Sequence, residues 1–467
     1  MKMWSGRFRQ PLDPEFERWQ RSFDFDRRLL AYELEASSAY ARALKGAGVL
    51  SSAELIEILD GLEKIGARAK DDPAFLDDQE AEDVHHFVEK HLVALIGNTG
   101  LKLHSGRSRN EQIATDLRLY ARASIDQLRK GTGDLLEAFV DRAEQAGSAA
   151  MPAYTHLQRA EPVLVAHWLL AYVEMLLRDA GRLQDCARRL NVCPLGSGAV
   201  AGTTLPLDRA LLAKTLGFDA PAANSMDVTS DRDFALEFVN DLSLLALHLS
   251  RWAEEMILFS TQEYGFVRLP EAYSTGSSAM PQKKNADLLE LTRAKAARVL
   301  ANAVALQATM KGLPLAYNKD LQETQEPLFQ SVEIMLSLLP MASGWMQSVE
   351  FDFETMQKGA QHGFMNSFAA ATYLVGKGVP FRTAHEQIGK AVQLCLEQGC
   401  ELENLPLEKL RKLNSAFDQD FYSSLKLSAV LAIHDVPGGT EPDRVRQAIA
   451  VAKQKIELLR EVNHARA

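Results

Sequence analysis

The chain has 467 residues, 46% of them apolar, and a net charge of −10 from 62 acidic and 52 basic side chains. These values suit a globular protein of about three domains, and the acidic balance argues against a nucleic-acid partner, which would require clustered Lys and Arg. The four cysteines lack the spacing of a zinc site and predict free thiols. The first residues lack the apolar run of a signal peptide, and no apolar run is long enough to span a bilayer. We therefore expect a cytoplasmic protein without a membrane segment.

Long helical patterns dominate the chain, and an all-α fold is predicted because strand signals are sparse. Five long helices are expected over about residues 111–145, 162–191, 230–264, 285–310 and 327–349. Pro162 and Pro327 suit the first turn of a helix, where a missing amide proton costs nothing. The run 242–249 is apolar around its whole circumference. Such a helix must be buried on all sides, which indicates a bundle core shared with other subunits.

The helical pattern divides the chain into three expected domains. An N-terminal helical domain covers residues 1–110, a central bundle of the five long helices covers 111–362, and a C-terminal domain with shorter helices covers 363–467. The loops between the long helices collect the Gly, Ser, Thr, Asn and Pro residues. Functional groups usually lie on loops that a rigid scaffold holds in place.

Two of these loops are rich in hydrogen-bond donors. Residues 276–285 (GSSAMPQKKN) begin with small residues and then supply hydroxyl, ammonium and amide groups, which is typical of a mobile loop that stabilises developing negative charge. Residues 104–110 (HSGRSRN) place two arginines where the helix from Glu111 begins, which favours a carboxylate or phosphate site. The alternatives are a polar connector for the first loop and a solvated helix cap for the second.

Three further segments carry polar groups. His156 lies in YTHLQ at 154–158 and can exchange protons near neutral pH, although a lone histidine is more often structural. Residues 317–322 (YNKDLQ) form a polar run between long helices, for which a surface turn is the alternative. The segment EDVHH at 82–86 lacks a metal-binding pattern, and no metal or redox cofactor motif is found in the sequence. Together the segments suit proton abstraction next to a carboxylate, followed by loss of a leaving group.

These motifs together resemble one enzyme family. Residues 276–285 are similar to the signature loop G-S-S-x-M-P-x-K-x-N of the fumarase/aspartase superfamily. The resemblance narrows to the argininosuccinate lyases through the segments 104–112 (HSGRSRNEQ), 154–162 (YTHLQRAEP), 317–323 (YNKDLQE), 4–8 (WSGRF), 225–234 (SMDVTSDRDF) and 437–444 (PGGTEPDR). The matches run in order along nearly the whole chain.

The resemblance implies an architecture and a reaction. The architecture is a homotetramer of three-domain subunits, with a tetrameric core of long helices from all four copies and active sites that are each built from three subunits. The reaction is the reversible β-elimination of argininosuccinate to L-arginine and fumarate, the last step of arginine biosynthesis. The resemblance implies no cofactor and no metal.

The resemblance also implies roles for single residues. Ser277 is expected to act as the base, activated by Lys283, and His156 as the acid, oriented by Glu290; the reverse assignment of Ser277 and His156 stays open. The positions expected to hold the substrate are Ser22, Arg109, Asn110, Thr155, Asn285, Tyr317, Gln322 and Gln325. Those expected near the site are Asp83, His85 and Arg232.

The chain departs from the family pattern at three positions. Gln325 stands where lysine is usual, so one charged contact with the substrate is replaced by an uncharged donor. Glu161 stands where glutamine is usual, and Ser105 where threonine is usual. The alternative functions are those of another fumarate-releasing lyase of the superfamily or of a structural relative such as the δ-crystallins. The complete acid–base set favours an active enzyme.

Overall fold

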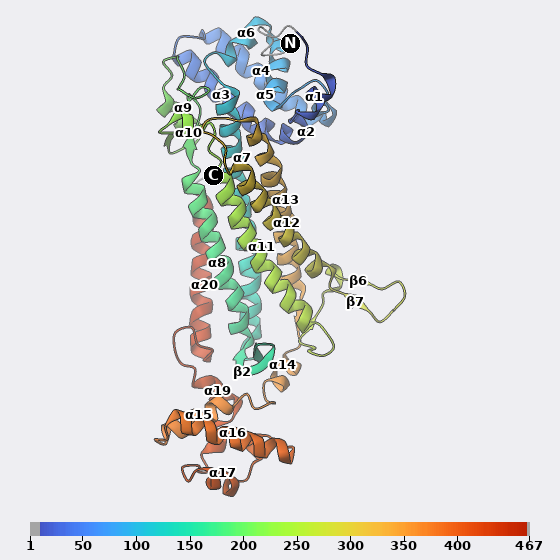
Figure 1. The fold of residues 1–467 in the computed structure, drawn as a ribbon, viewed down its shortest axis with the longest axis vertical. Coiled ribbons are helices and arrows are strands. Elements are labelled where there is room, and N and C mark those ends of the chain that lie inside the picture. Colours follow the sequence, from blue (N-terminus) through green and yellow to red (C-terminus); the bar gives the residue numbers. More distant parts are fainter. Residues whose placement is uncertain (1–9, 465–467) are drawn as a thin grey trace. The chain divides into compact units, whose positions relative to one another are not determined.

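The computed structural model describes residues 10–464, so the segment 4–8 lies outside the described residues. The fold is mostly helical (Figure 1). The chain divides into two compact units. Among the described residues, unit 1 comprises 10–128, Gly181–Leu244 and Ala297–Met335, and unit 2 comprises Arg129–Ala180, Leu245–Ala296 and 336–464. The predicted division into three domains stays a prediction.

The five expected long helices are all present. They are α7 (Arg109–Ala146), α8 (Val165–Arg189), α11 (Asp233–Phe259), α12 (Asp287–Met310) and α13 (Gln325–Ser348). Each contributes one stretch to unit 1 and another to unit 2. The run 242–249 is buried on only part of its circumference within one chain, because Leu244 and Leu247 are 38% and 47% exposed. No helix among the described residues is both long and apolar enough to cross a membrane.

Unit 1 also contains shorter helices and one small sheet. The helices are α1 (Pro14–Trp19), α2 (Phe23–Asp26), α3 (Leu30–Gly46), α4 (Ser52–Asp71), α5 (Val84–Ile96), α6 (Asn98–Leu101), α9 (Arg209–Thr215) and α10 (Ser225–Val228). Strands β3 (Val192–Cys193) and β4 (Ala220–Pro221) pair in parallel. Helices α3, α4 and α5 pack on one another. Asp83 caps α5 by accepting a hydrogen bond from the His86 amide at 2.7 Å, which fixes the end of α5 that carries the predicted site residues.

Unit 2 contains a β-hairpin that the sequence analysis did not predict. Strands β1 (Ala150–Thr155) and β2 (Gln158–Leu164) pair antiparallel. Pro162 therefore lies in a strand, opposite Pro152, and the prediction that it opens a helix is wrong: α8 begins at Val165. The pairing tolerates both prolines because the hairpin has only two strands and its register shifts next to Pro152.

The rest of unit 2 comprises short strands and helices. The strands are β5 (Val267–Arg268) paired with β8 (Glu350–Phe351), and β6 (Thr275–Gly276) paired with β7 (Lys284–Asn285). The helices are α14 (Phe353–Gly359), α15 (Ser367–Gly376), α16 (Phe381–Gln398), α17 (Leu407–Leu413), α18 (Phe421–Ser424), α19 (Leu427–Ala432) and α20 (Pro442–His464). A core of its own, including Leu374, Ile388 and Phe421, joins α15 to α18.

The prediction of shorter helices after about residue 363 is right for α15 to α19 and wrong for α20, which has 23 residues. Helix α20 runs alongside α8 (Figure 1), with Lys455 3.6 Å from Glu174. Lys453 also forms an ion pair with Glu144 of α7 at 2.9 Å. The last helix of the chain therefore packs on the long-helix bundle of unit 2.

One buried hydrogen bond connects the segment before α20 to the hairpin. The Leu164 amide donates to Thr440 Oγ1 at 2.8 Å, and Thr440 is buried. Thr440→Val keeps the side-chain shape but leaves this amide unpaired, so we expect the free energy of unfolding to fall by about 1–3 kcal/mol in urea titrations. Thr372→Val is the matched control, because that exposed hydroxyl bonds only within its own helix. Equal effects of the two substitutions would contradict the assigned role of Thr440.

Candidate active site

His156 lies in the two-residue turn at the tip of the β1–β2 hairpin. Thr155 pairs with Gln158, and between them His156 and Leu157 have φ values of 54° and 57°. Positive φ at both central positions is the geometry of a type I′ hairpin turn, whose twist matches that of the two strands. The side chains of Thr155 and His156 are exposed. The hairpin therefore presents both residues to solvent in a fixed turn.

The signature loop is also the tip of a hairpin. Strands β6 and β7 pair Thr275 with Asn285, so that residues 277–283 form the connecting loop. The Ser277 hydroxyl oxygen accepts hydrogen bonds from the amides of Ala279 and Met280 at 3.2 and 3.1 Å. Donors aimed at a hydroxyl oxygen stabilise its deprotonated form. The loop thus supplies two of the backbone donors that a basic serine needs.

The residues of the expected acid–base set all lie in unit 2. Lys283 is exposed on the signature loop, and Glu290 is exposed in the first turn of α12. Asn285 is half-buried and donates to Thr275 Oγ1 at 3.4 Å. Within residues 10–464 of one chain, no hydrogen bond or ion pair joins His156 to Glu290 or Ser277 to Lys283. Both pairings stay predictions.

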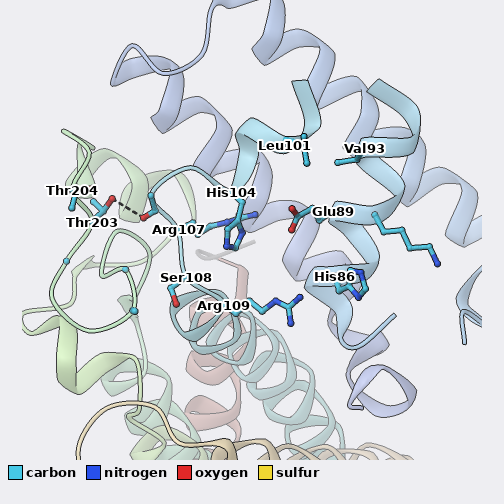
Figure 2. Close-up of a pocket in the computed structure, with 15 residues that line it drawn as sticks. His86, Glu89, Val93, Leu101, His104, Arg107, Ser108, Arg109, Thr203 and Thr204 are labelled. Atoms are coloured by element: carbon cyan, nitrogen blue, oxygen red, sulfur yellow. Dashed lines mark hydrogen bonds between the residues drawn. The ribbon is translucent and has the colours of Figure 1, made fainter. Parts of the chain in front are cut away.

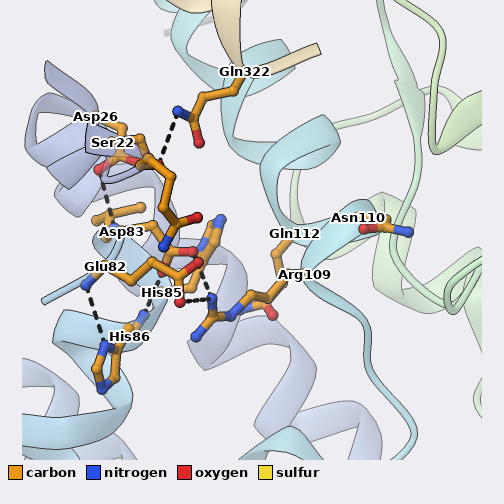
Figure 3. Close-up of polar contacts among 12 residues, drawn as sticks. Ser22, Asp26, Glu82, Asp83, His85, His86, Arg109, Asn110, Gln112 and Gln322 are labelled. Atoms are coloured by element: carbon orange, nitrogen blue, oxygen red, sulfur yellow. Dashed lines mark hydrogen bonds and ion pairs between the residues drawn. The ribbon is translucent and has the colours of Figure 1, made fainter. Parts of the chain in front are cut away.

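Unit 1 brings a second set of predicted residues together at the start of α5 (Figure 3). The Ser22 amide donates to the Glu82 carbonyl at 2.9 Å, and the Ser22 hydroxyl donates to Asp26 Oδ2 at 2.6 Å. Arg109, at the first position of α7, forms ion pairs with Asp83 at 2.9 Å and Glu82 at 3.2 Å. These bonds hold Ser22, Asp83 and Arg109 in one polar cluster.

Asp26 is a member of this cluster that the sequence analysis missed. It is buried, and its second carboxylate oxygen accepts the Val84 amide at 3.0 Å. It therefore links the hydroxyl of Ser22 to the first turn of α5. The signal that could have identified it is its position four residues after Ser22, which is the spacing of side-chain contacts on a helix.

Three more predicted residues come from the segments that enter α7 and α13. Gln322 is buried and donates to the Gln20 carbonyl at 3.2 Å (Figure 3). Asn110 donates weakly to the Ala199 carbonyl at 3.4 Å. Gln325 is only 3% exposed, and its Oε1 atom has no hydrogen-bond partner among the described residues. The amide at the position where lysine is usual is thus enclosed and incompletely paired.

Arg232 and Tyr317 are the remaining predicted site residues of unit 1. Arg232 is fully buried and donates to the Asp231 carbonyl at 2.9 Å, while two of its other nitrogens lack a partner within the described part of the chain. Burial lowers the pKa of Arg232 to about 10, so it remains cationic at neutral pH. Burial raises the pKa of the Tyr317 hydroxyl, and Arg232 opposes this shift.

His85, in the first turn of α5, lies against two buried carboxyl groups. Its Nδ1 atom lies 3.0 Å from Glu33 and 3.6 Å from Asp116. Burial raises the pKa of Glu33, but the charge and hydrogen bond of His85 outweigh this effect and hold the pKa at about 2. Burial and then Glu33 raise the pKa of Asp116 well above its usual range. Glu33 and His85 therefore form the charged pair, and the pKa of Asp116 is raised because its ionised form would add a second buried negative charge next to Glu33.

The same three side chains are close enough to hold a metal ion, since their ligand atoms lie within 4.8 Å of one another. Glu33 is already bonded by Ser37 at 2.6 Å and Gln112 at 3.1 Å. The sequence did not reveal Glu33 and Asp116. The position of an acidic residue in a helical segment does not show whether its side chain is buried against a partner or exposed to solvent. The prediction that the chain uses no metal stays a prediction.

A cavity of about 810 Å³ opens beside the segment that enters α7 (Figure 2). Its polar lining includes His104, Ser108, Arg109, Glu89 and Thr203. Burial and then the charge of Arg107 lower the pKa of His104 to about 4, so its imidazole is neutral near pH 7. Burial also raises the pKa of Glu89. The cavity is lined by hydroxyl and guanidinium donors and by one carboxyl group. This lining suits a ligand that bears both carboxylates and a cationic group.

Comparison with known proteins identifies the family. Residues 6–301 match the family model described as "Lyase", and residues 364–432 match "Argininosuccinate lyase C-terminal". The argininosuccinate lyase of Koribacter versatilis (strain Ellin345) is 58% identical over 467 residues and covers 100% of both chains. The chain belongs to the argininosuccinate lyase family. The argininosuccinate lyase of Heliobacterium mobile is 46% identical over 97% of this chain and 99% of that one.

Solved structures agree on the fold. EDDS lyase in complex with formate is 25% identical, with a TM-score of 0.86 over 98% of this chain and 93% of that one. Recombinant class II fumarase from Schistosoma mansoni is 17% identical, with a TM-score of 0.74 over 85% and 90% of the two chains. The predicted fumarase/aspartase-like fold of this argininosuccinate lyase family member is confirmed.

Asp26 gives the cluster around Ser22 a dependence on pH. Burial and then Asp83 raise its pKa from 3.8 to about 7. The folded state therefore binds this proton more tightly than the unfolded state, and the resulting stability is lost as pH rises from about 4 to about 7. In D26N this titration is absent, so the free energy of unfolding of wild type should fall relative to D26N over that range and then level off. Urea titrations at several pH values measure the difference, and a difference independent of pH would contradict the raised pKa.

Proposed function

We propose that this chain is an argininosuccinate lyase, a carbon–nitrogen lyase that cleaves argininosuccinate reversibly into L-arginine and fumarate in arginine biosynthesis. The observation that carries the proposal is the full-length similarity to argininosuccinate lyases, with 58% identity over 100% of both chains for one of them. The proposed chemistry draws only on side-chain and backbone groups. The free thiols of Cys186, Cys193, Cys395 and Cys400 fit a cytoplasmic location.

The first step is proton abstraction by Ser277. The serine oxygen takes the proton from the succinyl Cβ atom, and the electron pair moves into the adjacent carboxylate. The two amides that bond Ser277 Oγ support the alkoxide form, and the ammonium group of Lys283, which belongs to the same loop, adds a positive charge. Lys283 and Asn285 hold the carboxylate that becomes doubly charged. Such donors lower the barrier because they act only where charge develops.

The second step is loss of the leaving group. The electron pair returns to form the Cα–Cβ double bond of fumarate, and the Cα–N bond breaks. His156 donates a proton to the departing guanidino nitrogen, which leaves as arginine, and Glu290 orients the imidazole. The exposed position of His156 at the hairpin tip supports this role. The assignment with His156 as base and Ser277 as acid remains open, because the same geometry serves both.

Two sets of residues supply the donors that hold the substrate. In unit 1, Ser22, Asn110, Tyr317, Gln322 and Gln325 supply uncharged donors. Arg109 and Arg232 supply positive charge near the substrate carboxylates, and Asp83 and His85 keep the surrounding cluster in place. In unit 2, Thr155 adds a hydroxyl next to His156. Their hydroxyl and amide groups both donate and accept hydrogen bonds, which suits a substrate that has three carboxylates and also a guanidinium group.

We infer a homotetramer with a core of long helices from four copies, in which each active site is built from three of them. Exposed apolar side chains on these helices support it: Leu244 and Leu247 on α11, Leu291, Leu300 and Val304 on α12, and Met341 on α13. A monomer would leave this apolar surface in water. Packing against other copies removes it from water and stabilises the assembly.

The substrate assignment is tested by fumarate release, followed by ultraviolet absorbance. The purified protein is offered argininosuccinate, adenylosuccinate, aspartate and malate in parallel, and we expect release from argininosuccinate alone. His156→Asn should lower the turnover number by about two orders of magnitude or more without changing the helical circular-dichroism signal. Release from another substrate would overturn the choice of substrate. A folded protein that acts on none of them would favour a structural relative.

The assembly is tested at Leu300 of α12, which is 54% exposed in the single chain. Leu300→Lys places an unpaired charge in the inferred helical core, so we expect the mass measured by light scattering to fall from four subunits to fewer. Leu396→Lys is the matched control, because this leucine is also exposed, at 67%, and lies on α16, outside the long helices. A tetramer that persists in the Leu300 variant would contradict the inferred core.

A further inference from the structure

The turn that carries His156 is built from residues that disfavour its backbone conformation. His156 and Leu157 both have φ near 55°. Type I′ turns favour Asn-Gly or Gly-Gly because the Cβ atom of an L-residue crowds the backbone in the left-handed region. A hairpin selected for folding alone would carry glycine at the position of Leu157. The chain instead keeps a branched side chain there.

The side chain of Leu157 does not compensate for this conformation by packing within its own chain. It is 68% exposed in the single chain, so contacts within that chain leave most of its apolar surface uncovered. Leu157 thus combines an unfavourable backbone conformation with an exposed apolar group. Local rules are broken in this way mainly at functional positions, where another requirement outweighs folding stability.

The strands on either side of the turn are firmly anchored, which is why the turn persists. Leu164 is bonded to Thr440 at one end of β2, and helices α14 and α19 pack on the hairpin. The Arg159 guanidinium donates to the carbonyls of Gly359 and His362, both at 3.3 Å. A strained residue survives when its surroundings fix it from several sides. Here these anchors impose the left-handed conformation on the tip.

We propose that Leu157 is a positioning residue for His156, and that it acts through its Cβ atom. In the anchored hairpin, a residue with a Cβ atom has one narrow left-handed well, whereas glycine has access to a wide region with either sign of φ. Leu157 therefore restricts the turn to a single conformation and fixes the direction in which the neighbouring His156 imidazole leaves the backbone. A proton donor must be held within a fraction of an ångström of its target, so this restriction favours catalysis.

The inference rests on the proposed function, and three substitutions at one position separate its parts. L157G removes the Cβ atom and the apolar side chain together. L157A removes the apolar side chain but keeps the Cβ atom and the backbone restriction. L157N supplies a residue with a Cβ atom that tolerates the left-handed region. If the Cβ atom is what positions His156, L157A and L157N should resemble wild type and L157G should differ.

Steady-state kinetics with argininosuccinate test the effect on catalysis. For L157G we expect kcat to fall roughly ten-fold or more while KM changes little, because a displaced acid impairs the proton transfer rather than ground-state binding. The melting temperature of L157G should stay equal or rise, since glycine relieves the left-handed conformation. L157A and L157N should keep kcat within about two-fold of wild type. An L157A variant as slow as L157G would overturn the proposal, because it would assign the effect to the apolar side chain.

Hydrogen exchange of the backbone amides at 156–158 tests the same inference without substrate. We expect exchange at the turn to accelerate about ten-fold in L157G and to stay near the wild-type rate in L157A, because only glycine widens the conformational range. This result is independent of the reaction. If wild type released no fumarate from any substrate, the proposed function would fail, while the exchange rates would still decide whether Leu157 restrains the turn. Equal exchange in wild type and L157G would overturn the inference.

Discussion

The rest of the structure depends on the five long helices. Each helix satisfies most of its own backbone hydrogen bonds, so that side-chain packing is enough to stabilise it as a rigid element. Four of the five begin at or directly after a segment with predicted site residues. Helix α7 begins at Arg109 itself, α11 one residue after Arg232, α12 two residues after Asn285, and α13 at Gln325. The N-terminus of a helix carries partial positive charge. The proposed substrate has three carboxylates, and a helix N-terminus favours a negative charge of this kind.

Charge compensation in unit 1 shows how the predicted binding groups are kept in place. Arg109 is paired with Asp83 and Glu82, and His85 is paired with Glu33. A buried charge is stable only when a partner offsets the loss of hydration. These pairs also remove rotational freedom from the side chains before substrate arrives. The side chains thus lose their conformational entropy during folding and not during binding. A site of this kind is preorganised.

The sequence predicted the helices well and the hairpin badly, for reasons that concern particular residues. A helix of 24 or more residues repeats its pattern often enough to be recognised, as α7 does. The β1–β2 hairpin contains Pro152 and Pro162 in its strands and His156 and Leu157 in its turn, where the usual signals are β-branched residues and glycine. Helix α20 and the buried carboxyl of Asp26 depend on contacts with distant segments, which a single sequence does not encode locally. The motif residues were identified by resemblance, and their pairing across the site remains predicted.

Gln325, at a position where the family resemblance predicts lysine, is best understood through the charges around it. Arg232 is fully buried, stays cationic at neutral pH, and retains nitrogens without partners among the described residues. Gln325 is also buried, and its free Oε1 atom is an acceptor that lysine would lack. A site with one more acceptor and one fewer cation distinguishes between ligands less by their net charge and more by their hydrogen-bond geometry. Argininosuccinate carries a guanidinium donor as well as carboxylates. An acceptor at this position therefore weakens substrate binding less than the loss of a positive charge alone would.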